Sequence, residues 1–248
     1  MTAGDGAWGR MAYAFFTAMA ILAFFVMRHY QPKSSTSQPP ISSYHRFFLH
    51  MAAFIGGMIS AKLPFLFSWS AEGTFNPVWL TDGKTVTTGL AGAYAAVELA
   101  KALLGIRVKT GDSFAIPLAV GLAIGRLGCF VNGCCYGVPT EAPWGVDFLG
   151  DGLRHPTQLY EVAFHALMAA GLWRMARGNR LPTHRLQFYL IAYCAYRFAT
   201  EFIRPEPTLA MGLTFYQGFC LCFAAALAVQ WSSSPVFRGS VSPASSKS

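Results

Sequence analysis

Two arginines set within apolar runs are the side chains best suited to chemistry in this sequence. Arg126 lies in Gly125-Arg126-Leu127-Gly128, where the flanking glycines let other backbone or a ligand come close. Arg197, Glu201 and Arg204 are spaced to share one helical face. A guanidinium offers a planar fork of donors that matches phosphate oxygens, and an unpaired charge in apolar surroundings is costly. These residues predict a site for an anion such as a lipid phosphate; alternatively, Arg197 and Glu201 only neutralise each other.

A cluster of three thiols follows Arg126 closely. Cys129, Cys134 and Cys135 favour a structural disulfide from Cys129 to one of the adjacent pair if they face an oxidising compartment. Zinc binding is the weaker alternative, because no second ligand pair follows at a familiar spacing. Thiol redox chemistry is a third possibility. The remaining cysteines lie in apolar stretches and are expected to fill space: Cys194, Cys220 and Cys222.

The segment 129–157 combines turn residues with aromatic side chains. Its Asn, Gly and Pro residues favour a folded loop over a helix, and its aromatics suit the headgroup boundary of a membrane. We expect a small external head that lies over the two arginines and presents Arg154 and His155. His155 could act as an acid or base near neutral pH, or could simply cap the loop at the surface.

Composition identifies the elements that must position these residues. The chain has 248 residues, of which 54% are hydrophobic and 12% charged. Typical soluble domains carry roughly 25% charged residues, so an ordinary soluble protein is excluded. A spanning helix needs about 20 mostly apolar residues. We therefore expect an all-α membrane protein with about seven transmembrane helices, near residues 8–27, 47–69, 86–106, 114–130, 160–175, 187–203 and 213–231.

Basic residues predict the orientation of these helices, because they concentrate on the cytoplasmic side. One side holds Arg28, Lys33, Arg46, Arg107, Lys109, Arg174, Arg177, Arg180, Arg185, Arg238 and Lys247, and the other Lys84, Arg154 and Arg204. The N-terminus is thus expected outside and the C-terminus in the cytoplasm. The net charge of +8 is spread over separate loops, which argues against nucleic-acid binding. Residues 1–231 are expected to form one transmembrane domain, and 232–248 a disordered tail.

Three blocks of the chain resemble the prolipoprotein diacylglyceryl transferase family. They are Gly125-Arg126-Leu127-Gly128-x-Phe130-x-Asn132-Gly133-x-x-x-Gly137, Arg154-His155-Pro156-Thr157-Gln158-Leu159-Tyr160-Glu161 and Tyr193-x-x-x-Arg197-Phe198-x-x-Glu201-Phe202-x-Arg204. The resemblance is specific over roughly residues 114–207 and is supported downstream by Gln217-Gly218. Seven spans with an external N-terminus also agree with that family.

The resemblance implies a multi-pass enzyme of the bacterial inner membrane. Such enzymes move the diacylglyceryl group of phosphatidylglycerol onto the lipobox cysteine of a preprolipoprotein signal peptide and release glycerol 1-phosphate. By matched position, Arg126 and Arg197 would be catalytic and would hold the phosphate. The substrate-binding set would be Arg126, Asn132, Gly137, His155, Gln158, Tyr160, Arg197, Glu201 and Arg204. No cofactor or metal is expected.

The chain departs from the family pattern at several positions. Cys129 and Cys134 stand where the signature usually has Asn and Glu, and Thr87-Thr88-Gly89 stands where a His-Gly-Gly is typical. The resemblance therefore supplies no general base. Alternative functions are a non-catalytic phospholipid-binding accessory protein and a transferase with another acceptor.

Overall fold

The protein is mostly helical throughout the part that the computed structural model describes, residues 7–32, 41–67, 85–148, 150, 152–208 and 212–233. Seven α-helices lie in these ranges, one at each of the seven predicted stretches. Four of them are long and apolar enough to cross a membrane: Trp8–Tyr30, Ser43–Pro64, Asp112–Val131 and Phe215–Ser232. The prediction of a mostly helical membrane protein is confirmed. The described residues belong to two compact units, residues 37–109 and residues 1–36 with 110–248.

The unit 37–109 contains two helices, α2 (Ser43–Phe67) and α4 (Val86–Leu103). They pack through small residues, because a Cβ added at Gly56 would lie 2.8 Å from the carbonyl oxygen of Gly92. Close approach of backbones at small residues is a common way for helices to associate in membranes. On α4, Lys101 and Glu98 form an ion pair of 2.8 Å.

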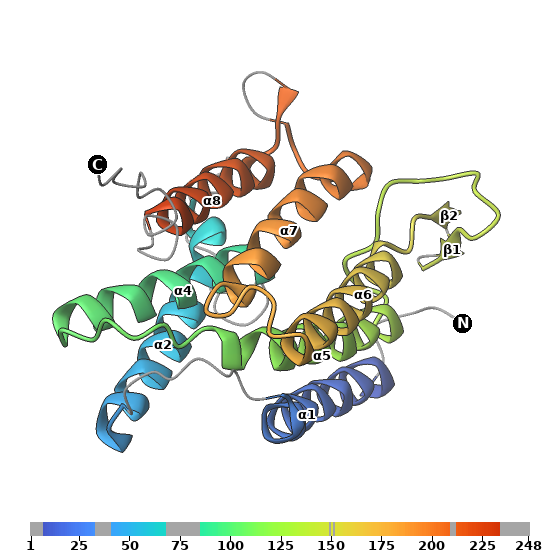
Figure 1. The fold of residues 1–248 in the computed structure, drawn as a ribbon. Coiled ribbons are helices and arrows are strands. Elements are labelled where there is room, and N and C mark those ends of the chain that lie inside the picture. Colours follow the sequence, from blue (N-terminus) through green and yellow to red (C-terminus); the bar gives the residue numbers. More distant parts are fainter. Residues whose placement is uncertain are drawn as a thin grey trace, which may run out of the picture. The chain divides into compact units, whose positions relative to one another are not determined.

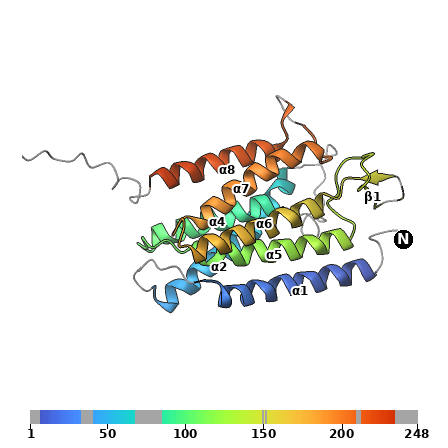
Figure 2. The ribbon, with the colours of Figure 1, turned by 45° about the vertical axis from the view of Figure 1, so that its right-hand side comes forward.

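The second unit is a helical bundle with helices α1 (Ala7–Tyr30), α5 (Asp112–Val131), α6 (Thr157–Arg177), α7 (Arg185–Thr200) and α8 (Phe215–Ser232). A short 3₁₀ helix, η1 (Glu201–Ile203), follows α7. Helices α1, α5 and α6 lie side by side, and α7 lies beside α8 (Figures 1 and 2). Apolar side chains of α5, α6 and α7 form its buried core, with Ala115, Ile116, Ala119, Leu172, Ala176 and Tyr189.

Side-chain caps mark where two of these helices begin. The carboxylate of Asp112 accepts hydrogen bonds from the backbone N–H groups of Thr183 (2.6 Å) and Arg185 (2.9 Å), so it caps the start of α7. At the start of α8, Thr214 and Gln217 form a capping box, in which each side chain bonds the backbone N–H of the other. The Asp112 cap joins the start of α5 to the start of α7, whereas the capping box of α8 lies within its own first turn.

The predicted loop between the fourth and fifth stretches folds into a small hairpin. Strand β1 (Val146–Asp147) pairs antiparallel with β2 (Leu153–Arg154). Phe148 is buried and stacks on Tyr136 at 5.4 Å. Helix α6 then begins at Thr157, where the sequence places the end of the loop. The expectation of a folded segment is confirmed.

Some expectations concern residues outside the described ranges. Lys33, Lys84, Arg238 and Lys247 are among them, as is the predicted disordered tail from residue 234 onward.

Candidate functional site

A buried carboxylate, Glu161 on α6, is the centre of the polar cluster in the bundle. Its Oε1 lies 2.8 Å from Nη2 of Arg126 on α5, and its Oε2 lies 3.4 Å from Nη2 of Arg204. The hydroxyl of Tyr193 on α7 donates to Oε1 at 2.8 Å. Glu161 is fully buried, so these contacts compensate the loss of its hydration. Residues from α5, α6, α7 and the segment after η1 therefore meet at one carboxylate.

A second ion pair lies at the end of α7. Nη2 of Arg197 contacts Oε2 of Glu201 at 2.8 Å, and both residues are buried. The hydroxyl of Thr214 also donates to Glu201, at 3.2 Å. The predicted shared face of Arg197 and Glu201 is thus confirmed, and the two residues form an ion pair, but this pair uses only one nitrogen of the Arg197 guanidinium. Arg204 does not continue this pair, because η1 and its end turn the chain toward Glu161.

The guanidiniums of these two clusters keep unused hydrogen-bonding capacity. Within the described ranges, Arg126, Arg197 and Arg204 form ion pairs with two buried carboxylates, Glu161 and Glu201. Four buried guanidinium nitrogens have no hydrogen-bond partner among the described residues: Nε of Arg126, Nε and Nη1 of Arg197, and Nε of Arg204. A buried charged donor without a partner is costly, and a phosphate supplies several acceptor oxygens at once. The arrangement is suited to an anionic ligand.

Two residues at the start of α6 fix the cysteine segment. The side-chain amide of Gln158 donates to the carbonyl of Cys134 at 2.5 Å, and the hydroxyl of Thr157 donates to the carbonyl of Cys135 at 2.6 Å. Gln158, which is expected to bind substrate, therefore donates a hydrogen bond to the backbone. Its buried Oε1 has no hydrogen-bond partner in the described part of the chain.

Gly137 and Asn132 occupy tightly packed positions in the same segment. A Cβ at Gly137 would lie 2.5 Å from the carbonyl oxygen of Ile203 and 2.8 Å from Cβ of His155, so only glycine fits. Asn132 ends α5, and its Oδ1 is buried without a hydrogen-bond partner among the described residues. Packing accounts for Gly137, whereas Asn132 retains an acceptor for a ligand.

His155 and Tyr160 belong to a chain of hydrogen bonds at the edge of the hairpin. Nδ1 of His155 lies 3.0 Å from the hydroxyl of Tyr160, which accepts a hydrogen bond from the indole of Trp144 at 2.7 Å. No contact in the described part of the chain links this trio to Arg126 or Arg197.

Sequence reasoning missed the importance of the α6 interior. The sequence motif that contains Glu161 assigns this residue no role, and His165 lies outside the three motifs. His165 is fully buried, with Nε2 at 3.6 Å from Glu161 and Nδ1 at 2.8 Å from the hydroxyl of Tyr189. The spacing of Glu161 and His165 by four residues on an apolar helix is a signal that could have indicated this pair.

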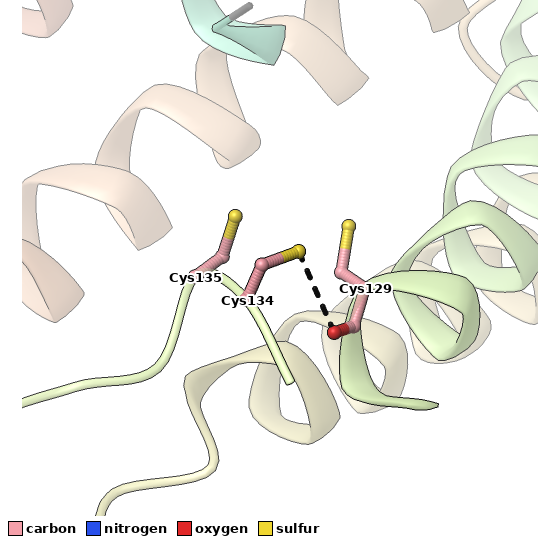
Figure 3. A group of neighbouring side chains, drawn as sticks. All are labelled: Cys129, Cys134 and Cys135. Carbon is pink, nitrogen blue, oxygen red and sulfur yellow. Dashed lines mark hydrogen bonds between the residues drawn. The ribbon is translucent and has the colours of Figure 1, made fainter. Parts of the chain in front are cut away.

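The three clustered cysteines come together as free thiols. Cys129 lies at the end of α5, with Cys134 and Cys135 on the following turn, and their sulfur atoms all lie within 4.8 Å of one another (Figure 3). All six cysteines of the chain are free, so the expected disulfide is not formed. The Cys129 sulfur lies 3.9 Å from Nη1 of Arg126.

Known proteins are similar to this chain in sequence. Residues 9–232 match the prolipoprotein diacylglyceryl transferase family. The phosphatidylglycerol-prolipoprotein diacylglyceryl transferase of Chlorobaculum tepidum is 33% identical over 68% of this chain and 65% of its own length. That of Bordetella bronchiseptica is 35% identical over 64% of this chain and 64% of its own length. That of Idiomarina loihiensis is 32% identical over 84% of this chain and 79% of its own length. The chain thus spans slightly less than two thirds of the first two relatives. With a match that extends from α1 to α8, the chain belongs to the prolipoprotein diacylglyceryl transferase family.

Proposed function

We propose that this chain transfers the diacylglyceryl group of phosphatidylglycerol to the cysteine thiol of a preprolipoprotein signal peptide and releases glycerol 1-phosphate. Its family supports the proposal, as do relatives named for this reaction. The observation that carries it is the set of partnerless guanidinium nitrogens on Arg126, Arg197 and Arg204. These donors fit the phosphate that is present in the donor lipid and in the leaving group.

Catalysis then consists of stabilising charge on the leaving group. The acceptor thiolate attacks the glyceryl carbon that bears the phosphate, a C–S bond forms, and the C–O bond breaks with its electron pair on the phosphate oxygen. Arg126 and Arg197 are the proposed catalytic residues, because fixed donors in a dry site stabilise developing charge strongly. Glu161 and Glu201 hold the two guanidiniums in place. The remaining proposed substrate-binding residues are Asn132, Gly137, His155, Gln158, Tyr160, Glu201 and Arg204.

The proposed setting is the bacterial inner membrane, crossed by seven helices with the N-terminus outside and the C-terminus in the cytoplasm. The hairpin 129–157 would form an external head beside the site. This orientation is supported by the distribution of basic residues. A single transmembrane domain over 1–231 remains a prediction.

The test uses purified protein with labelled phosphatidylglycerol and a lipobox peptide. Wild type should form the thioether product, and Arg197→Ala should lower the rate by about 10²–10³-fold, because a donor to the leaving group is lost. Arg174→Ala, which removes an exposed arginine from the last turn of α6, is the matched control and should keep wild-type rates. Absence of product from wild type under all conditions would refute the proposal.

A second candidate, a lipid-binding accessory protein without catalysis, is favoured by one observation. Thr87 on α4 is buried and stands where the family typically has a histidine. Complementation separates the two functions, since rescue of a strain depleted of its own transferase requires catalysis. Rescue by wild type and by Arg174→Ala, but not by Arg197→Ala, would exclude the accessory protein.

A further inference from the structure

The cluster of Cys129, Cys134 and Cys135 has the geometry of a metal site. Its three sulfur atoms lie within 4.8 Å of one another; those of Cys129 and Cys135 point the same way, and that of Cys134 lies between them, directed toward the Cys129 carbonyl (Figure 3). In a tetrahedral zinc site, bonds of about 2.3 Å place the sulfurs about 3.8 Å apart. Closing the cluster onto an ion therefore needs movements of at most about 1 Å, which side-chain rotation supplies.

The backbone is shaped to bring these thiols together. Gly133 and Cys135 have φ values of 67° and 64°, a left-handed conformation that is unusual for a cysteine. Thr157 and Gln158 hold the carbonyls of Cys135 and Cys134 from the start of α6. Residues around ligands that fix their orientation are typical of metal sites.

The charges near the cluster favour thiolates, which are the form that binds metal. Nη1 of Arg126 lies 3.9 Å from the Cys129 sulfur. Three thiolates with Zn²⁺ carry one net negative charge, so a guanidinium beside them is a favourable neighbour.

Burial of the cluster is one-sided. Cys129 is buried, Cys134 is half-buried and Cys135 is exposed. Three protein ligands with one accessible side match a catalytic zinc site, which keeps its fourth position for substrate, rather than a structural site closed by four ligands.

We propose that Cys129, Cys134 and Cys135 bind a zinc ion as three thiolates and that its fourth position takes the thiol of the acceptor cysteine. This inference rests on the proposed transferase function. A zinc ion would deprotonate the acceptor, because a thiol bound to zinc loses its proton. This chain needs such a means, since Thr87 stands where the family typically has a histidine.

The reaction balances as follows. The acceptor thiol binds zinc and releases its proton to water. The bound sulfur then attacks the glyceryl carbon; the C–S bond forms while the C–O bond to phosphate breaks, and the phosphate leaves with the electron pair beside Arg126. The product is a neutral thioether, which binds zinc more weakly than a thiolate and can leave. Because Arg126 adjoins both the thiolates and the phosphate site, the nucleophile and the leaving group meet at one place.

Metal binding is tested first, without reference to activity. Full-length protein in detergent is reduced, stripped with a chelator and titrated with Co²⁺, whose thiolate complexes absorb by charge transfer in the near ultraviolet. We expect one equivalent to bind with this absorption and to be displaced by Zn²⁺. Cys129→Ser, Cys134→Ser and Cys135→Ser should each weaken binding on the order of 100-fold or more. Cys222→Ser, which removes an exposed thiol on α8, is the matched control and should bind as wild type does.

The fourth ligand is tested by adding the acceptor to the cobalt protein. A lipobox peptide with its cysteine should change the d–d and charge-transfer bands, whereas the same peptide with serine should leave them unchanged. Identical spectra with both peptides would overturn the role of the acceptor thiol. Zinc should also restore the transfer rate of stripped wild type, and should fail to restore that of Cys129→Ser.

Other results overturn the inference and spare the proposed function. Wild type that binds no Co²⁺ after reduction, yet transfers at full rate after chelation, has no zinc site. Isolation of a Cys129 disulfide whose reduction yields no metal binding leads to the same conclusion. Conversely, thiolate-bound cobalt that responds to the cysteine peptide, in a protein without transferase activity, refutes the proposed reaction and keeps the metal site. Thermal unfolding of the serine variants without metal should match that of wild type, which shows that the loss of metal binding comes from the missing thiol and not from misfolding.

Discussion

The two units of this protein hold their helices together by opposite means. In 37–109, α2 and α4 meet through glycine, alanine and serine, and a Cβ at Gly56 or Gly92 would collide with the facing helix. In the bundle, α5, α6 and α7 meet around Glu161, which joins Arg126 and Tyr193. Small residues allow close contact between helices without polar groups. The polar cluster is stable only when each buried polar side chain has a hydrogen-bond or ion-pair partner.

Among the described helices, only four are long and apolar enough to cross a membrane. Helices α1, α2, α5 and α8 pass a test of length and apolar character, but α6 and α7 do not. Helix α6 carries Gln158, Glu161 and His165 in its buried face, and α7 carries Arg197. Helix α4 also fails this test, whereas α5, which carries Arg126, passes it, so apolar character does not separate the helices that bear the proposed chemistry from the others.

The largest effect on stability is expected from Glu161→Ala. The substitution leaves Arg126 and Arg204 without their shared carboxylate, and breaking a buried ion pair from one side costs about 3–5 kcal/mol. Thermal or denaturant unfolding in detergent should show this loss. Glu161→Gln retains the shape and one acceptor and should lose less. A variant Glu161→Ala as stable as wild type would show that the polar cluster does not hold the bundle.

A smaller loss is expected where α2 meets α4. In Gly56→Ala the new methyl would lie 2.8 Å from the carbonyl oxygen of Gly92 and would collide with Ala96, and overpacking of this kind costs about 1–3 kcal/mol. Gly125→Ala on α5 is the matched control, since a Cβ there meets nothing within 4 Å. It should be neutral or stabilising by about 0.5–1 kcal/mol, because alanine favours a helix. Equal effects of the two substitutions on unfolding would contradict close packing in this unit.

Much of the helical framework was predictable because apolar runs must span a membrane and loops must be polar. Each of the seven expected stretches contains a helix, and the start of α6 at Thr157 follows from the turn residues before it. The hairpin strands are only two residues long, which is too short for an alternation of apolar and polar residues to predict them. Their position depends on packing of Phe148 against Tyr136.

The site was less predictable, because pairing depends on contacts across helices. The sequence identifies Arg126 and Arg197 as charges within apolar runs, where an unpaired charge is costly. Glu161 lies 35 residues after Arg126, and nothing in that spacing identifies it as the partner of Arg126. The sequence favours a disulfide for the clustered cysteines and gives zinc binding only as the weaker alternative, because no second ligand pair follows. Only the turn at Gly133 and Cys135 brings the third sulfur to the other two.

The smallest effect is expected from Glu98→Gln, which removes the ion pair of α4. Lys101 lies in the last turn of its helix, where the carbonyl ends attract positive charge, and the Glu98 side chain is 35% exposed. Lys101 itself is buried, but its partner Glu98 is half-exposed, so water can take the place of the carboxylate and the loss should lie near the value of about 0–1 kcal/mol for exposed pairs, far less than in Glu161→Ala. Raising the salt concentration should reduce the difference between Glu98→Gln and wild type further, because salt screens exposed charges more than buried ones. A loss as large as that of Glu161→Ala would mean that α2 and α4 also depend on buried charge, and the contrast between the two units would fail.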